Sequence, residues 1–166
     1  MSLLLAAVGA IVAGLLELTI GSYLRVGDAQ PHFVLVFGVI WTIAAGLDAA
    51  LVWAFAGGLL LDVLAPRPIG SSAFSLLIAL SLAGLAARPL SRIRPLAPIP
   101  LVPVLSVVNS LLLLVTFGAL QSPIAAPDPV GSVIPSAVYD AIIAIVAGPL
   151  IVAIHDRATE QERITW

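Results

Sequence analysis

The chain contains no cysteine and no lysine among its 166 residues. Without cysteine it has no disulfide bonds, no thiolate metal ligands and no thiol nucleophile. Charged residues make up only 10% of the sequence, whereas soluble globular domains carry about 25%. The seven basic residues are all arginines, and they form no positive run of the kind that binds nucleic acid.

Hydrophobic residues, in contrast, make up 61% of the chain, and the mean hydropathy is +1.17. This composition is typical of a polytopic membrane protein. A membrane-spanning helix needs about 20 mostly apolar residues, so six of them would use about 120. We therefore expect one transmembrane domain over residues 1–166, with any function inside the helix bundle or on its rims. The N-terminal apolar run lacks the basic start of a signal peptide, which favours a retained first helix.

Six apolar runs predict an all-α bundle of six transmembrane helices. A proline-rich segment, "RPLAPIPLVPV" (Arg94–Val104), precedes the fifth helix and predicts irregular or broken backbone where it enters the membrane. The predicted helices are Leu3–Ile20, Phe33–Ala45, Ala49–Ala65, Ser71–Ala87, one that starts between Leu96 and Val104 and ends near Leu120, and Pro135–Ile154.

The arginines predict the orientation of the bundle. With six spans, five arginines fall on one side and only Arg25 and Arg67 on the other. The positive-inside rule then places both termini in the cytoplasm. Trp41 and Trp53 flank a short predicted hairpin at similar distances, which favours one aromatic belt at the membrane interface.

Three acids lie within the apolar helices, each among small residues at helical spacing. All three, Glu17, Asp62 and Asp140, fall near the outer ends of their helices. Small residues let helices approach closely in a bilayer, so we expect these faces to pack together and to hold the acids inside the bundle. The faces are Ala6, Ala10, Gly14, Glu17 and Gly21; Ala50, Ala54, Gly58 and Asp62; and Ala137, Asp140, Ala141, Ala144 and Gly148.

A charge at membrane depth costs at least about 2.5–3.5 kcal/mol, so each acid needs a partner or water. The acids could reach the interface or bond to backbone, share an outward-facing polar pocket, or form a catalytic site. For Asp62 we expect a structural role. Its carboxylate is placed to accept hydrogen bonds from Arg67 or from the start of the fourth helix near Ser71, with Gly70 allowing a sharp turn.

The stretch "GGLLLDVLAPRPIG" (Gly57–Gly70) resembles the central segment of the rod-shape-determining protein MreD family, and Gly58, Asp62 and Gly70 match its pattern. "QPHFVLVFGVIW" and "SAFSLLIALSLAGL" resemble the second and fourth helices of the family. "YDAIIAIVAGPLIVAIHDR" is similar to the last one, with Asp140 as its polar residue. The inner hairpin, which is commonly basic in the family, carries Asp48 here.

The resemblance implies a non-enzymatic subunit of the bacterial cell-elongation machinery in the cytoplasmic membrane. Its expected partner is a membrane-anchored MreC-type protein, which links actin-like MreB to the enzymes of wall (peptidoglycan) synthesis. The resemblance implies no cofactor. It also implies a likeness to the six-helix substrate-binding subunits of energy-coupling-factor transporters. The residues expected to organise a partner-binding outer rim are Glu17, Gly58, Asp62, Arg67, Gly70 and Asp140.

The sequence also allows two other functions. A small-molecule binding subunit of such a transporter would need a pocket of about 300 Å³ or more between the helices. An intramembrane aspartyl hydrolase would need Asp62 and Asp140 close enough to share a proton and activate water. Neither aspartate has the asparagine-containing surroundings of lipoprotein signal peptidases, and no histidine–acid set has the spacing of a metal site.

Overall fold

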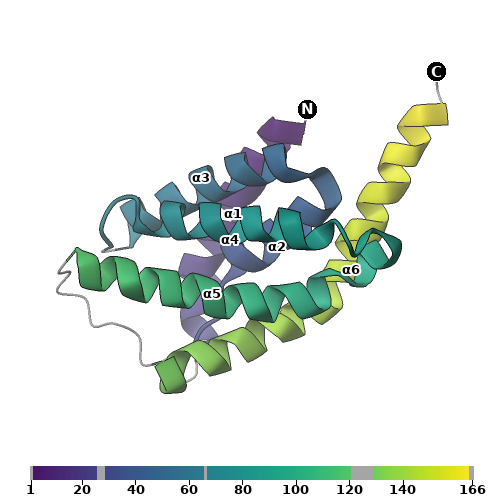
Figure 1. The fold of residues 1–166 in the computed structure, drawn as a ribbon. Helices are drawn as coiled ribbons and strands as arrows, with labels where there is room; N and C mark the ends of the chain where they lie inside the picture. Colours follow the sequence, from purple (N-terminus) through teal and green to yellow (C-terminus); the bar gives the residue numbers. More distant parts are fainter. Residues whose placement is uncertain (1, 26–28, 66, 121–128, 165–166) are drawn as a thin grey trace.

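A computed structural model describes residues 2–25, 29–65, 67–120 and 129–164, and this part of the chain is all-helical (Figure 1). The six α-helices are α1 (Ser2–Tyr23), α2 (Phe33–Ala45), α3 (Leu47–Leu64), α4 (Ser71–Ala87), α5 (Pro98–Ala119) and α6 (Ile134–Ile164). A short 3₁₀ helix, η1 (Ser91–Leu96), precedes α5, and a π-helical turn, η2 (Pro129–Val133), leads into α6.

Helix α2 is the centre of the bundle. It packs against each of the other five α-helices, and nine of its thirteen residues are buried. Its sequence, "FVLVFGVIWTIAA", is apolar on every side, and a helix without a polar face is stable only when neighbours cover it. The surrounding helices include α3 and α4, which lie side by side along the bundle (Figure 1).

The predicted six-helix bundle is confirmed, and the bounds of α2 and α4 agree with those predicted. Four helices, α1, α3, α5 and α6, are long and apolar enough to cross a membrane. With 13 and 17 residues, α2 and α4 are shorter, so six crossings stay a prediction. At 1.5 Å per residue, α2 is only about 20 Å long.

One predicted boundary was wrong. Helix α6 continues ten residues past Ile154, because the polar segment that follows is rich in the good helix formers alanine, glutamate, glutamine and arginine. The expected broken backbone before the fifth helix is confined to η1, where Ile93 is non-helical. Helix α5 begins at Pro98, within the predicted range of Leu96 to Val104, and is α-helical from there on. Pro98 and Pro100 fall in the first turn, where proline removes no intrahelical hydrogen bond, and the helix continues through Pro103 in its interior.

The small-residue faces point into the bundle, as predicted. Most of their residues are buried, including Ala10 and Gly14 on α1, Ala54 and Gly58 on α3, and Ala144 on α6. The expectation that all three faces meet one another was wrong, however. Helix α3 packs against α1 and α4, whereas α6 packs mainly against α5 and α2. The small face of α6 meets α5 at Gly148, where an added Cβ would lie 2.8 Å from the Pro98 ring.

The predicted aromatic belt was also wrong for Trp53. Its side chain is only 4% exposed, and its Nε1 donates a hydrogen bond to the Val34 carbonyl oxygen at 2.9 Å. The indole fits into the core because Gly9 and Gly38 leave room for it, and a Cβ on either would approach the ring to within 3 Å. Trp41 stacks on Trp53 with ring centroids 6.0 Å apart.

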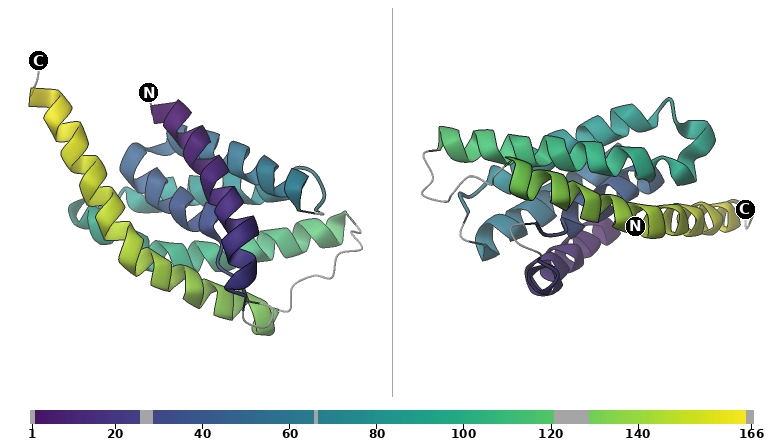
Figure 2. Two further views of the ribbon diagram at one scale, coloured as in Figure 1. Left: turned by 180° about the vertical axis from the view of Figure 1, so that it is seen from behind. Right: turned by 90° about the horizontal axis from the view of Figure 1, so that it is seen from below.

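The two ends of the bundle differ in charge. At the arginine end, Arg94 of η1 donates hydrogen bonds to the carbonyl oxygens of Ile43 and Ala44 at 2.7–3.0 Å. It also pairs with Asp156 of α6 at 3.1 Å. The first turn of α1 lies toward this side, and the last turns of α6 project beyond the other helices (Figure 2). Glu17, Asp62 and Asp140 lie at the opposite, acidic end.

Substitution of Gly58 tests the close packing of α3 on α4. A Cβ at Gly58 would lie 2.3 Å from the Ala73 Cα and 2.6 Å from its backbone nitrogen. Because backbone atoms cannot move aside cheaply, Gly58→Ala should destabilise the fold by about 1–3 kcal/mol and lower the melting temperature in detergent by several degrees. The control is Gly118→Ala in α5, where a Cβ meets nothing within 4 Å. Equal melting temperatures for the two variants would contradict the close approach.

Candidate functional site: three buried acids at one end of the bundle

Asp62, in the last turn of α3, caps the start of α4. Its two carboxylate oxygens accept hydrogen bonds from the backbone N–H groups of Gly70 at 2.9 Å, Ser72 at 2.9 Å and Ala73 at 3.4 Å. The Ser71 hydroxyl donates to Oδ1 at 3.1 Å. The first N–H groups of a helix have no intrahelical partner, so one side chain from a neighbouring helix satisfies most of them. The predicted contact between Asp62 and the start of α4 is therefore confirmed.

The loop between α3 and α4 is shaped to bring these groups together. Gly70 has φ +92°, in the left-handed region that favours glycine. The turn that it makes points the first N–H groups of α4 back at α3. Arg67, the other expected donor to Asp62, instead donates from Nη1 to the Ser72 hydroxyl at 3.2 Å. It thereby ties the same loop to the same helix start.

Glu17 performs the corresponding task for α2. Its Oε2 accepts a hydrogen bond at 2.9 Å from the backbone N–H of Val34, the second residue of that helix. The side chain is only 6% exposed, so the carboxylate does not extend to the bundle surface. A carboxylate beside the first turn of a helix also lies near the positive end of the helix dipole.

Asp140, on α6, holds the segment that leads into α2. One oxygen accepts the His32 backbone N–H at 2.8 Å, and the other lies 2.9 Å from His32 Nδ1. The Ser106 hydroxyl of α5 donates to that second oxygen. Asp140 is fully buried. Its hydrogen-bond partners on other segments, and not only the dipole of its own helix, offset the cost of burying the carboxylate.

The imidazole of His32 sits among charges of both signs. Burial by itself lowers the pKa of His32, but the Asp140 carboxylate, which it contacts, and the Glu17 carboxylate both raise it, while Arg67 opposes them. The net result is a pKa of His32 above its ordinary value. A protonated ring donates to Asp140 and completes a charge-assisted pair.

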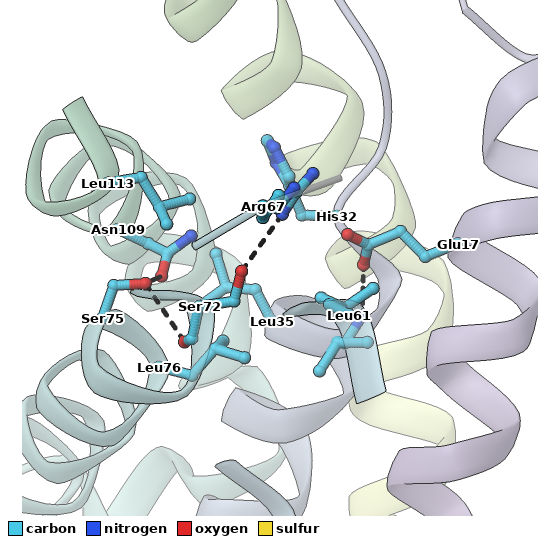
Figure 3. A pocket seen from close by; sticks show the side chains of 11 residues that line it. Glu17, His32, Leu35, Leu61, Arg67, Ser72, Ser75, Leu76, Asn109 and Leu113 are labelled. Carbon is cyan, nitrogen blue, oxygen red and sulfur yellow. Dashed lines mark hydrogen bonds between the residues drawn. The ribbon is translucent and has the colours of Figure 1, made fainter. Parts of the chain in front are cut away.

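A small polar cavity lies beside Glu17 and His32, but Asp62 and Asp140 do not line it, so it is not the polar pocket shared by all three acids that the sequence allowed. It has a volume of about 10 Å³ and is lined by Glu17, His32, Arg67, Ser72 and Asn109, with leucines closing it (Figure 3). This is room for about one water molecule. On its far side the Ser75 hydroxyl donates to Asn109 Oδ1 at 2.8 Å.

The sequence reasoning missed the polar partners on other helices. The sequence analysis did not place His32, Ser75, Ser106 or Asn109 among the site residues. A signal was present, because each of these serines and the asparagine interrupts an apolar helix and is buried. A buried polar side chain requires a hydrogen-bond partner. The sequence could not say which partner, since the contacts cross between helices.

The two membrane aspartates are held by separate sets of donors. Asp62 and Asp140 accept hydrogen bonds from different groups, and no hydrogen bond joins the two carboxylates in the described part of the chain. The described residues also contain no group of three or more histidines and acids that could hold a metal ion. The chemistry that these acids perform is the satisfaction of buried backbone donors.

Comparison with known proteins assigns the chain to a family. The family model of the rod shape-determining protein MreD matches residues 1–155. The chain belongs to the MreD family. No curated protein and no solved structure matches it, so the likeness to transporter subunits stays a prediction. As a member of the MreD family, the protein is a membrane component of the rod-shape machinery, and MreD proteins are structural, shape-determining proteins.

Removal of the Asp62 carboxylate tests the capping role in this MreD protein. Asp62→Ala leaves three backbone N–H groups at the start of α4 without their acceptor, at a cost of at least about 2 kcal/mol. We expect a clearly lower melting temperature in detergent and faster hydrogen exchange at residues 70–73. The control is Asp48→Ala, which removes an exposed acid from the first turn of α3 and should cost less than about 1 kcal/mol. A similar small loss for both variants would refute the capping role.

Proposed function

We propose that this MreD protein is a non-catalytic scaffold of the cell-elongation machinery in the bacterial cytoplasmic membrane. It binds a membrane-anchored MreC-type protein and so links the actin-like MreB to the enzymes of peptidoglycan synthesis. The observation that carries the proposal is the use of all three membrane acids to fix helix starts at one end of the bundle. A stiff end of this kind suits a protein that acts by holding partners in place.

The partner-binding surface that we propose is the outer rim, residues 65 and 67–70 between α3 and α4. Hydrogen bonds from the Gly70 N–H to Asp62 and from Arg67 to the Ser72 hydroxyl hold this loop against α3 and α4. Ile69, at the tip of the loop, is 78% exposed. Glu17, Gly58, Asp62 and Asp140 are buried, so these residues set the geometry of the rim rather than touch a partner. We propose Ile69, exposed on this loop, as an apolar contact of the interface.

Copurification with the partner tests the rim. Ile69→Glu should reduce the amount of MreC-type protein recovered with the detergent-solubilised chain by about tenfold, the loss of about 1.4 kcal/mol. The matched control is Ile93→Glu, at an isoleucine that is 49% exposed in η1, between α4 and α5. Unchanged recovery with Ile69→Glu, or equal loss with both variants, would count against the outer rim. Hydrolysis of a lipoprotein by the purified chain, lost in Asp62→Asn, would overturn the non-catalytic assignment.

The orientation that we propose has the arginine end and both termini in the cytoplasm. The contacts of Arg94 with Ile43, Ala44 and Asp156 support a common end for the loops and the tail that carry most of the arginines. Five of the seven arginines lie in those segments. Arginine-rich segments favour the cytoplasmic side of a membrane.

Cysteine labelling tests this orientation without background, because the chain has no cysteine of its own. With a membrane-impermeant maleimide applied to intact spheroplasts, Ile69→Cys should react. Asp48→Cys, in the exposed first turn of α3 at the arginine end, should react only after permeabilisation. The reverse pattern would invert the topology.

The two alternatives receive less support. The polar cavity beside Glu17 and His32, at about 10 Å³, is far below the 300–1,000 Å³ of small-molecule sites. Two larger hollows, of about 360 and 300 Å³, do reach the size that the transporter alternative requires, the first between α1, α2, α3 and α6 and the second at the arginine end. Neither is lined by Glu17, Asp62 or Asp140, so the membrane acids would not contact a ligand in either. The oxygens of Asp62 and Asp140 are occupied by backbone and side-chain donors, unlike those of a proton-sharing catalytic pair.

A further inference from the structure

A cavity of about 300 Å³ opens at the arginine end of the bundle, on the side away from the three acids. It is lined by Thr42, Ile43, Gly84, Ala87, Arg88, Arg94 and Ala97. These residues come from the last turns of α2 and α4 and from the η1–α5 connection, three segments that meet beside α6 (Figure 1). The cavity is of the size that holds a small molecule or the polar part of a lipid.

Its two arginines have different roles. Arg94 is fixed in place by hydrogen bonds to the Ile43 and Ala44 carbonyl oxygens and by its ion pair with Asp156. Asp156 offsets part of its charge. Arg88 ends α4 and is exposed, and within the described residues its guanidinium has no ion pair and no hydrogen bond. The cavity therefore combines one positioned guanidinium with one that is free to bind an anion.

The remainder of the lining is apolar or small. Gly84 and Ala87 leave the space on α4, Ile43 and Ala97 form its apolar wall, and the Thr42 hydroxyl is already bonded to the Gly38 carbonyl oxygen. A free inorganic anion would gain nothing from such a wall. An amphiphile gains from both parts, and basic pockets between the ends of membrane helices are known to take lipid headgroups.

We propose that this cavity binds the phosphate headgroup of an anionic phospholipid from the leaflet at the arginine end. Arg88 binds the phosphate oxygens, the remaining donor capacity of Arg94 assists it, and the glycerol and upper acyl carbons lie against Ile43 and Ala97. The site is independent of the outer rim, so its failure would leave the proposed scaffold function intact.

Thermal unfolding of the full chain in a neutral detergent tests the proposal. Short-chain phosphatidylglycerol at ten times its dissociation constant should raise the melting temperature by about 3 °C or more. Phosphatidylcholine with the same chains should not, because its headgroup has no net charge. Inorganic phosphate at the same concentration separates a lipid from a free anion: stabilisation by phosphate equal to that by phosphatidylglycerol would overturn the lipid assignment.

Matched variants locate the site. Arg88→Gln should abolish the shift caused by phosphatidylglycerol, whereas Arg157→Gln, at an exposed arginine of α6 that does not line the cavity, should retain it. Ala87→Leu should block the cavity and weaken the response, and its neighbour Ala86→Leu, which does not line the cavity, should not. If Arg88→Gln and Arg157→Gln respond alike, or if phosphatidylcholine stabilises as well as phosphatidylglycerol, the proposal is wrong.

Discussion

The contact of the Asp62 carboxylate with the first N–H groups of α4 is the interaction on which much of this bundle depends. A helix that starts inside a membrane protein leaves several backbone donors without intrahelical partners, and hydrocarbon offers them no acceptor. One buried carboxylate accepts from three of these donors and from a serine hydroxyl. The α3–α4 loop can therefore be short, and the two helices can approach as closely as Gly58 and Ala73 do.

The same principle operates at both ends of the central helix. At the start of α2, Glu17 binds the N–H of Val34, while Asp140 binds the N–H of His32. At the end of α2, Arg94 binds the carbonyl oxygens of Ile43 and Ala44. Acids meet the positive end of the helix dipole and an arginine meets the negative end. Helix α2, which is shorter than a typical membrane span, is thus held at its two ends by charged side chains from α1, α6 and η1.

A structural role for the few charged residues inside the bundle agrees with membership of a family of shape-determining proteins. Membrane acids mark ion pathways or catalytic sites in other proteins, whereas here each of the three accepts a hydrogen bond from a backbone N–H group. These hydrogen bonds hold helix starts at the acidic end, on which we propose that a partner docks. At the arginine end, Arg94 is structural whereas Arg88 is not, and this difference separates a residue that builds the fold from one that is available to a ligand.

The sequence by itself determined the number of helices, the bounds of α2 and α4, and the burial of the three acids on small-residue faces, because apolar length and helical spacing are local properties. It also predicted that Asp62 caps α4, since the acid and the helix start are separated by one short loop. Only the tertiary structure decided that Asp140 reaches across to His32, that α6 packs on α5 and α2 rather than on α1 and α3, and that Trp53 lies in the core. These outcomes depend on which helices become neighbours, and in a chain that is apolar almost throughout, many pairings satisfy the same pattern of small and large side chains.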